Sequence, residues 1–427
     1  MYIRPDLLNP LNALKKLTAE RQKRPLVAIP GHFLHWLGIS PKLLVAAYRD
    51  KGIRCESFIG SAPKALPDLK PKDLRFPNAL DESLLYYRCV LTDSLPGEYR
   101  AIREDQPCEG RRLLATHYAH CMSLFSKNLP QLVVTLQGFE PHNAAARAAA
   151  YRIGIPVLTL ENTAVATRMI WDSISGITTN RNSARSFYWR YQDRVQGKES
   201  DDYCKKLIAD TRQLKSDEHS SPQKRREICI DKPFVLFLGQ VYTDSSIVFG
   251  LRHWSSPVEA LQRCVEWCER QDYGLVVKLH PKEFSGINTI DNRPYDRLTY
   301  RKIQAIPSLV EGLRRIEAKI DEKNELDTYH LIDGCRIAVT INSQSGLEAA
   351  IRGKPVVCCG DAFYCGFDFT CDAPSPAYFS VAMEQANQTL SNAVAQKARQ
   401  FAYIFFHHYC REKSVGSIVQ LTQENGL

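Results

Sequence analysis

The stretch TINSQSGLEAAIRGKPVV, residues 340–357, carries the pattern that decides the fold. An apolar run ends in small polar residues at positions 342–346, a helical pattern continues to Gly353, and apolar residues then resume. Short apolar runs on both sides of a helical segment are typical of a strand–helix–strand unit in a parallel sheet. The stretch therefore predicts an α/β fold with a serine-rich turn at the end of a buried strand.

Similar units recur along the chain. Residues 143–154 follow a helical pattern that ends at Gly154, and Pro156 precedes the next apolar run. We expect strands within PLVAIPG (25–31), IRCESFIG (53–60), RCVLTDS (88–94), QLVVTLQG (131–138), IPVLTLEN (155–162), PFVLFLGQV (233–241), GLVVKLHP (274–281), CRIAVTINS (335–343) and KPVVCCG (354–360). This alternation predicts doubly wound, Rossmann-like sheets in both halves.

The length of the chain predicts more than one domain. At 427 residues it exceeds the size of a single hydrophobic core, so two domains of about 200 residues each are expected. The polar residues 195–230 indicate a helix followed by an exposed linker. We predict Rossmann-like domains at residues 1–220 and 221–392, facing a cleft, and a C-terminal helix at 393–427 that packs across them.

Composition limits the class of protein. Hydrophobic residues make up 44% and charged residues 24%, as in ordinary globular proteins, and no apolar run approaches the roughly 18 residues that span a bilayer. The net charge is +9, but the basic clusters LKKLTAERQKR and SPQKRRE lack aromatic residues, which disfavours nucleic-acid binding. Attraction to an anionic membrane leaflet stays open. The 14 scattered cysteines follow no signal peptide and form no C-x-x-C pair, which indicates a reducing cytoplasm and no structural zinc.

The turn at residues 342–346 has two interpretations. If the following helix begins near Ser345, its N–H groups and dipole can bind a phosphate. Ser343 and Ser345, which flank Gln344, would add hydroxyl donors, Gly346 would permit close approach, and Glu348 could accept from a ribose hydroxyl. A capping box, with Ser345 as N-cap and Glu348 at N3, explains the same residues without a ligand.

A second polar cluster lies in VVKLHPKE, residues 276–283. The strand should end at His280 because Pro281 cannot continue the hydrogen-bond ladder. His280 can donate to a phosphate, and Lys278 and Lys282 add positive potential. A histidine that merely ends a strand is the alternative.

A third cluster follows the strand in LFLGQVYTDSSI, residues 236–247. Gln240 and Asp244 lie just after the predicted strand end, so Asp244 presents a carboxylate at the edge of the sheet. The alternative is that Asp244 or Ser245 only caps the next helix. The sequence does not decide between a nucleophile and a cap.

The first half offers further polar residues at strand ends. Glu161 ends the strand in TLENTAVATR and would be placed for acid–base work on an acceptor hydroxyl. Gly31 and His32 follow one other strand, and Gln137, Glu140 and His142 follow another. Taken singly, each is better explained by a satisfied polar loop.

Together, the segments GQVYTDSSI, VVKLHP and INSQSGLEAAIRGKPVVCCGDAFYCGF, between residues 234 and 367, resemble capsule polysaccharide synthesis proteins of the KpsC/KpsS-like type. TLENTA is similar to a glutamate motif in the first domain of that family. The family often reads GFEALL and PFYAGWG where this chain reads GLEAAI and AFYCGFD.

The resemblance implies a retaining β-Kdo glycosyltransferase with a GT-B-like fold and CMP-β-Kdo as its donor. It implies that His280 and Pro281 bind CMP, and that Ser343, Ser345 and Glu348 form the nucleotide-binding turn and helix. Asp244 would match the acidic residue thought to form a Kdo adduct, and Glu161 would lie beside the acceptor.

The residues fit this chemistry. No D-x-D motif is present to hold a metal ion on a diphosphate, and helix N–H groups, two serines and an imidazole could neutralise the single phosphate of CMP. Retention needs a carboxylate nucleophile that the acceptor hydroxyl then displaces.

We therefore predict a cytoplasmic, metal-independent transferase without a cofactor, with a nucleotide sugar as donor and a surface glycan or glycolipid, such as lipopolysaccharide or capsule, as acceptor. Peripheral association with the inner membrane is left open. The alternatives are a CMP-sialic acid or CDP-glycerol-type transferase and a non-catalytic module that binds a nucleotide or glycan.

Overall fold

The computed structural model describes residues 25–30, 34, 37–58, 80–96, 98, 108–136, 139–163, 165–173, 182–218, 228, 230–288, 290 and 292–425. The chain forms two compact units. The first comprises Met1–Arg88, Arg103–Ser186 and His408–Leu427, and the second comprises Cys89–Ile102 and Phe187–His407. Each unit is built on one six-stranded sheet.

The sheet of the first unit has the strand order β12-β5-β4-β3-β1-β2. Strands β1 to β4 run parallel, whereas β5 and β12 pair antiparallel at one edge. The strands are β1 (Leu26–Ile29), β2 (Arg54–Ser57), β3 (Leu132–Leu136), β4 (Val157–Asn162), β5 (Arg168–Asp172) and β12 (Arg411–Glu412).

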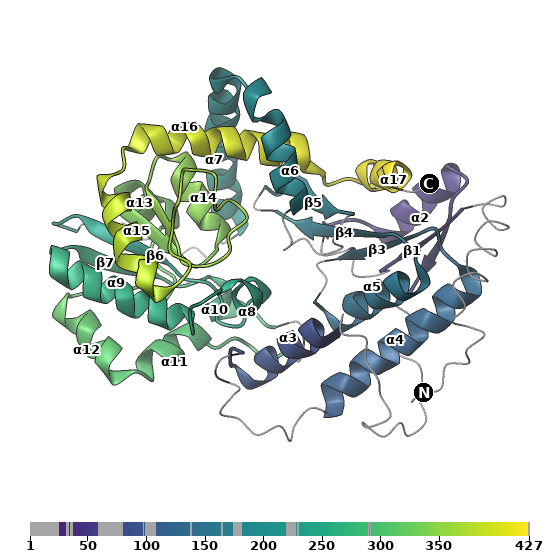
Figure 1. Cartoon of the computed structure of the whole chain (residues 1–427), viewed down its shortest axis with the longest axis horizontal. Coiled ribbons are helices and arrows are strands. Elements are labelled where there is room, and N and C mark those ends of the chain that lie inside the picture. The colour runs from purple at the N-terminus through teal and green to yellow at the C-terminus, as the bar shows by residue number, and fades with distance from the viewer. Residues whose placement is uncertain are drawn as a thin grey trace. The chain divides into compact units, whose positions relative to one another are not determined.

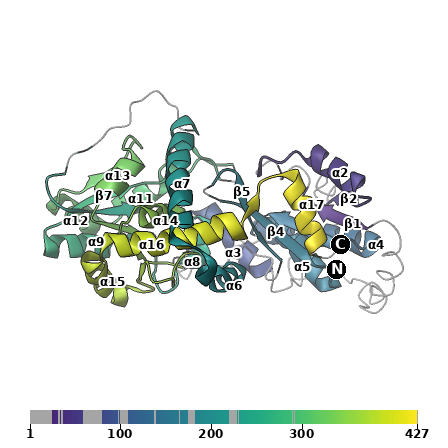
Figure 2. The same cartoon turned by 90° about the horizontal axis from the view of Figure 1, so that it is seen from above.

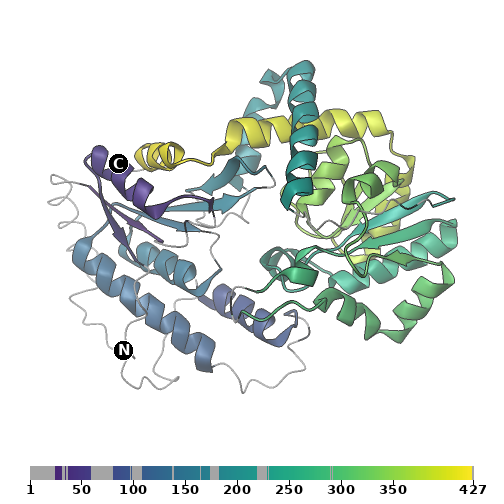
Figure 3. The same cartoon turned by 180° about the vertical axis from the view of Figure 1, so that it is seen from behind.

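Helices cover both faces of this sheet because the strand side chains alternate between two apolar layers. Val27 of β1 belongs to a cluster with Tyr48 of α2 (Pro41–Asp50) and Ile418 of α17 (Val415–Glu424). Ala28 belongs to the opposite cluster, with Phe125 of α4 (Cys108–Asn128) and residues of α5 (Pro141–Ile153). Helices α4 and α5 lie side by side on that face (Figures 1 and 3).

The sheet of the second unit is parallel throughout, in the order β11-β10-β9-β6-β7-β8. Its four central strands are buried at every position, as their continuous apolar runs predict. The strands are β6 (Phe234–Leu238), β7 (Gly274–Lys278), β8 (Lys319–Ile320), β9 (Ile337–Thr340), β10 (Val356–Cys358) and β11 (Cys371–Asp372).

Helix α9 packs on β6 and β7, while α14 packs on β9 and β10 and is covered by α16 (Figure 1). Helix α7 crosses α16 on its outer side (Figure 2). The helices assigned wholly or partly to this unit are α3 (Asp81–Thr92), α6 (Asn182–Tyr191), α7 (Gly197–Glu218), α8 (Ser245–Gly250), α9 (Pro257–Gln271), α10 (Lys282–Ser285), α11 (Leu298–Gln304), α12 (Pro307–Arg315), α13 (Thr328–Gly334), α14 (Gln344–Ile351), α15 (Pro376–Gln388) and α16 (Ser391–Ala402). Short 3-10 and π-helical turns occupy Gln192–Arg194 and Tyr403–Tyr409.

The strand order of the second sheet reverses beside β6. The chain adds β7 and β8 on one side of β6 and then β9, β10 and β11 on the other. In open parallel sheets, ligands bind at the carboxyl ends of the strands where such a reversal occurs. Here the reversal lies between β6 and β9, the strands that precede the Asp244 loop and the serine-rich turn.

The predicted fold class is confirmed: the chain is α/β and contains two Rossmann-like units, as a GT-B-like fold does. One predicted strand was wrong, because RCVLTDS forms the end of α3. Helix α3 begins with two acidic residues and buries Leu84, Tyr87 and Val90, which is helical spacing. The sequence did not reveal β5, β8, β11 or β12, which lie at or near sheet edges.

The two units also differ from the predicted domain limits of 1–220, 221–392 and 393–427. Helix α7 belongs to the second unit because it packs on α16. The last part of the chain is not one helix: α16 ends at Ala402, β12 then pairs with β5, and α17 packs on α2. The predicted linker falls largely on residues 219–227 and 229, outside the described residues.

Among the described residues, no helix has both the length and the apolar character that crossing a membrane requires.

Candidate functional site

The loops after β6 and β9 are joined by a pair of amide side chains. Gln240 Nε2 donates to Asn342 Oδ1 over 2.8 Å, and the backbone N–H of Asn342 donates to Gln240 Oε1 over 3.1 Å. Gln240 Nε2 also donates to Ser246 Oγ over 3.1 Å. Because these bonds use both ends of the Gln240 amide, we correct the prediction that Gln240 binds the nucleotide: it connects the two loops.

Asp244 is the N-cap of α8. Its Oδ1 accepts from the backbone N–H of Ser246 over 2.9 Å and from Ser246 Oγ over 2.7 Å. Its Oδ2 has no hydrogen-bond partner within the described part of the chain. Gln240, Ser246 and Asp244 thus form a chain of hydrogen bonds that holds one oxygen of the Asp244 carboxylate. The predicted cap is confirmed.

The N-cap of the helix after β9 is Ser343, two residues earlier than the predicted Ser345. Ser343 Oγ accepts from the N–H of Ser345 over 3.2 Å, and Gln344 is the first residue of α14. The predicted capping box was therefore wrong, since Gly346 and not Glu348 occupies N3. Glu348 is only 8% exposed, which gives a ribose hydroxyl little access to it.

Packing requires a glycine at position 346, for a reason that the sequence did not show. A Cβ at this position would overlap Tyr364 Oη and lie 2.9 Å from Thr340 Cγ2. Tyr364 is fully buried, and its hydroxyl donates to the carbonyl oxygen of Ser343. The glycine therefore accommodates Tyr364 beneath the turn, and its predicted role in close approach of a phosphate stays a prediction.

His280 lies just after β7, at the same edge of the sheet. Its Nδ1 accepts from the backbone N–H of Lys282 over 3.1 Å. In a neutral ring the proton must then reside on Nε2, which makes Nε2 a donor. Strand β7 ends at Lys278, two residues before the predicted end at His280, and Pro281 is the N-cap of the short helix α10. The geometry gives His280 a fixed tautomer suited to an anion.

Lys278 is placed differently from the prediction. Its ammonium group lies 2.6 Å from Asp321 Oδ2 and also donates to Asn324 Oδ1. Lys278 is only 4% exposed. A buried lysine with this pairing neutralises Asp321 inside the unit. We therefore correct the assignment of Lys278 to the nucleotide site, because its positive charge is already neutralised by the buried Asp321.

Tyr242, two residues before Asp244, forms a cluster with Glu98 and Lys302. Tyr242 Oη donates to Glu98 Oε1 over 2.8 Å, and Lys302 Nζ lies 3.3 Å from the same oxygen. Lys302 also lies 4.8 Å from the centre of the Tyr242 ring. Burial raises the pKa of Tyr242, so the phenol stays protonated. Sequence reasoning missed this cluster because its members are far apart in the chain.

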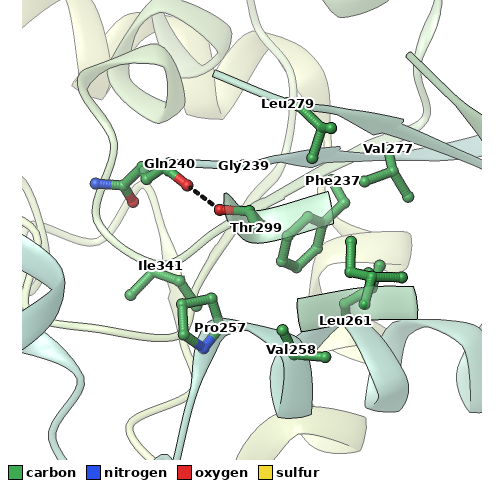
Figure 4. Close-up of a pocket in the computed structure, with 11 residues that line it drawn as sticks. Phe237, Gly239, Gln240, Pro257, Val258, Leu261, Val277, Leu279, Thr299 and Ile341 are labelled. Carbon is green, nitrogen blue, oxygen red and sulfur yellow. Dashed lines mark hydrogen bonds between the residues drawn. The ribbon is translucent and has the colours of Figure 1, made fainter. Parts of the chain in front are cut away.

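A small pocket lies under the loop after β6, lined mainly by apolar side chains (Figure 4). Thr299 Oγ1 donates to the carbonyl oxygen of Gln240 over 3.0 Å, and the Gln240 amide points away from the apolar lining (Figure 4). The lining residues are Phe237, Gly239, Gln240, Pro257, Val258, Leu261, Val277, Leu279, Thr299, Ile303 and Ile341. This apolar lining suits core packing, not a charged ligand.

In the first unit, Glu161 lies at the end of β4, with Glu140 nearby at the N-cap of α5. Glu140 Oε2 is buried and has no hydrogen-bond partner among the residues that the structure describes. Burial, reinforced by the charge of Glu161, raises the pKa of Glu140 to about 7. His142 Nε2 lies 3.1 Å from Asn143 Nδ2. The other candidates here, residues 31, 32 and 137, lie outside the described residues.

Comparison with known proteins identifies a family. The family model described as "Capsule polysaccharide biosynthesis protein" matches residues 186–409, a span that includes Asp244, His280 and the turn at 342–346. No curated protein matches the chain.

Several solved structures are similar to this chain. A β-Kdo 2,7 transferase, KpsC of Thermosulfurimonas dismutans, is 18% identical over 71% of this chain and 89% of that chain, with a TM-score of 0.44. A β-Kdo 2,4 transferase KpsC of the same organism is 18% identical over 67% of this chain and 82% of that chain, with a TM-score of 0.42. A UDP-GlcNAc 2-epimerase of Neisseria meningitidis is 12% identical over 94% of this chain and 99% of that chain, with a TM-score of 0.39.

The family match covers more than half of the 427 residues and contains every motif on which the predicted resemblance depends, apart from TLENTA. The chain therefore belongs to the capsule polysaccharide biosynthesis protein family.

Proposed function

We propose that the protein is a retaining glycosyltransferase that moves β-Kdo from CMP-β-Kdo to a surface glycan or glycolipid acceptor. The observation that carries the proposal is the Asp244 carboxylate at the strand reversal, with Oδ1 held by Ser246 and Oδ2 left for a ligand. Membership of a capsule biosynthesis family supports a glycan as the product.

In this proposal the phosphate of CMP lies against the turn after β9. Ser343 and Ser345 are half-buried there and offer hydroxyl groups, and His280 Nε2 is the donor set by the Nδ1 contact with Lys282. One phosphate on a departing CMP needs fewer positive groups than a diphosphate. Helix N–H groups, hydroxyls and an imidazole serve this purpose without a divalent ion.

The transfer occurs in two displacements. Asp244 Oδ2 attacks the anomeric carbon, forming a C–O bond as the bond to the phosphate oxygen of CMP breaks. The acceptor hydroxyl then attacks the same carbon, its proton passes to water, and the Asp244 carboxylate is released. Two inversions at one carbon retain the β configuration.

In this proposal the acceptor is a growing lipopolysaccharide or capsule glycan at the cytoplasmic surface of the inner membrane. The net charge of +9 suits attraction to an anionic leaflet.

Donor trials test the proposal. The purified protein is incubated with CMP-Kdo, CMP-sialic acid or CDP-glycerol and a mixture of glycan acceptors, and the released cytidine nucleotide is quantified. We expect release only with CMP-Kdo, and a β-linked product in proton NMR spectra. Turnover with CDP-glycerol alone, or an α-linked product, would replace the proposal with another transferase, and binding of CMP without turnover of any donor would favour a binding module.

Metal independence is tested in the same assay. Turnover should persist in excess EDTA because no reacting atom needs a cation. Loss of activity that Mg²⁺ or Mn²⁺ restores would contradict this part of the proposal.

A further inference from the structure

Two cysteines and an aspartate meet at one edge of the second sheet. Cys358 and Asp372 are the last residues of the neighbouring parallel strands β10 and β11, and they are partners in register. Register partners in a parallel pair place their side chains on the same face of the sheet. Cys365 joins them from the connecting loop, so that both Sγ atoms and a carboxylate oxygen lie within 4.8 Å of one another.

We propose that Cys358, Cys365 and Asp372 bind one thiophilic divalent cation, Zn²⁺, with water completing the coordination. Thiolate and carboxylate groups are established zinc ligands, with Zn–S near 2.3 Å and Zn–O near 2.0–2.2 Å. A tetrahedral site with these bond lengths has ligand atoms about 3.5–3.8 Å apart. The present spacing, within 4.8 Å, thus needs a closure of about 1.3 Å at most.

Charge and proton balance fit such a site. Two thiolates, one carboxylate and Zn²⁺ leave one net negative charge, and the Arg252 guanidinium interacts electrostatically with both Cys365 and Asp372. Zinc displaces the protons of both thiols to solvent as the two Zn–S bonds form. Because metal binding releases these protons, zinc affinity should fall as the pH is lowered.

The site would also support the turn after β9. Tyr364 precedes Cys365 in the chain, its hydroxyl bonds the Ser343 carbonyl, and its side chain fills the space beside Gly346. A cation on Cys365 would fix the loop that carries this tyrosine. The cation would stabilise this loop without contacting reacting atoms, so transfer should continue after EDTA removes it.

The sequence does not predict this site, because its cysteines are seven residues apart and its third ligand is an aspartate on a strand of only two residues. Register pairing between two strands, which has no local signal, creates the group.

Metal titration of the full-length protein tests the inference without any assay of transfer. Reduced, metal-free protein is titrated with Co²⁺, followed by its thiolate-to-metal charge-transfer band, and the Co²⁺ is then displaced with Zn²⁺. Parallel variants are Cys365→Ser, Asp372→Asn and the control Cys371→Ser, which removes a buried thiol from the same strand but outside the group. Circular dichroism verifies that each variant is folded.

We expect one equivalent of metal in wild type and in Cys371→Ser, with the charge-transfer band lost in Cys365→Ser. Zinc affinity should fall in both ligand variants by more than the tenfold to hundredfold typical of outer-shell changes. Unchanged affinity in Cys365→Ser, no band in wild type, or a native Cys358–Cys365 disulfide found by peptide mapping would overturn the inference.

Discussion

Gly346→Ala should destabilise the second unit because of Tyr364. The added methyl group would overlap the hydroxyl of a fully buried tyrosine and lie 2.9 Å from the Thr340 methyl group. Overpacking of a rigid core typically costs about 1–3 kcal/mol. Urea unfolding followed by far-ultraviolet circular dichroism measures this loss, and Gly197→Ala is the control because a Cβ there meets nothing within 4 Å.

A double variant separates packing from ligand binding at this glycine. Tyr364→Phe removes the overlapping oxygen at a cost of about 0.5–1.5 kcal/mol for the lost hydrogen bond to Ser343. Gly346→Ala should then cost less in the Tyr364→Phe background, by about 1 kcal/mol. Gly346→Ala should also disrupt CMP binding because the added methyl group displaces the turn, and CMP affinity, measured by calorimetry, should recover together with stability in the double variant.

Two outcomes would refute this reasoning. Unfolding of Gly346→Ala at the same urea concentration as wild type would show that Tyr364 does not constrain the position. Additive stability losses, with CMP binding still abolished in the double variant, would show that Gly346 is needed by the phosphate itself.

Three further predictions concern other charged and polar groups. His280→Ala should weaken CMP binding about tenfold to a hundredfold, as expected for one charge-assisted hydrogen bond, and unchanged affinity in calorimetry would remove His280 from the site. Lys278→Met should lower the free energy of unfolding by about 3–5 kcal/mol because Asp321 stays buried without its partner, and a urea midpoint equal to that of wild type would contradict this. Glu140 has a pKa raised from 4.5 to about 7 in the folded chain, so its stabilising proton is fully held below pH 4.5 and is lost as the pH rises through about 7. Relative to Glu140→Gln, the unfolding free energy of wild type should therefore decline between these pH values, by at most about 3.4 kcal/mol. A pH-independent difference would show that the pKa of Glu140 is not raised.

The parallel sheets could be predicted because their strands are buried on both faces. Runs such as VLFL in β6 and LVV in β7 are apolar at every position, and only the polar turn residues interrupt them. The same reasoning misassigned RCVLTDS, because a short apolar run does not distinguish a strand from the last turn of a buried helix.

The candidate site at the carboxyl ends of β6, β7 and β9 could be predicted only in outline. Strand ends are local features, so Asp244, His280 and the serine-rich turn were identifiable from the sequence. The bonds that decide what each residue does are long-range: Gln240 and Asn342 are 102 residues apart, and Lys278 and Asp321 are 43 apart. No spacing rule links such positions, which explains why Gln240 and Lys278 were assigned to the nucleotide and not to structural contacts.

The central claim is that Asp244 becomes covalently attached to the transferred sugar. Intact-protein mass spectrometry after mixing with CMP-Kdo, without acceptor, tests it directly, and Asp244→Asn is the matched variant because asparagine can still accept the cap hydrogen bond from Ser246. We predict a mass increase of one Kdo residue on wild type, mapped to Asp244 by peptide sequencing, and no increase on Asp244→Asn, which should still bind CMP. An adduct on Glu161, or full transfer activity in Asp244→Asn, would contradict the account.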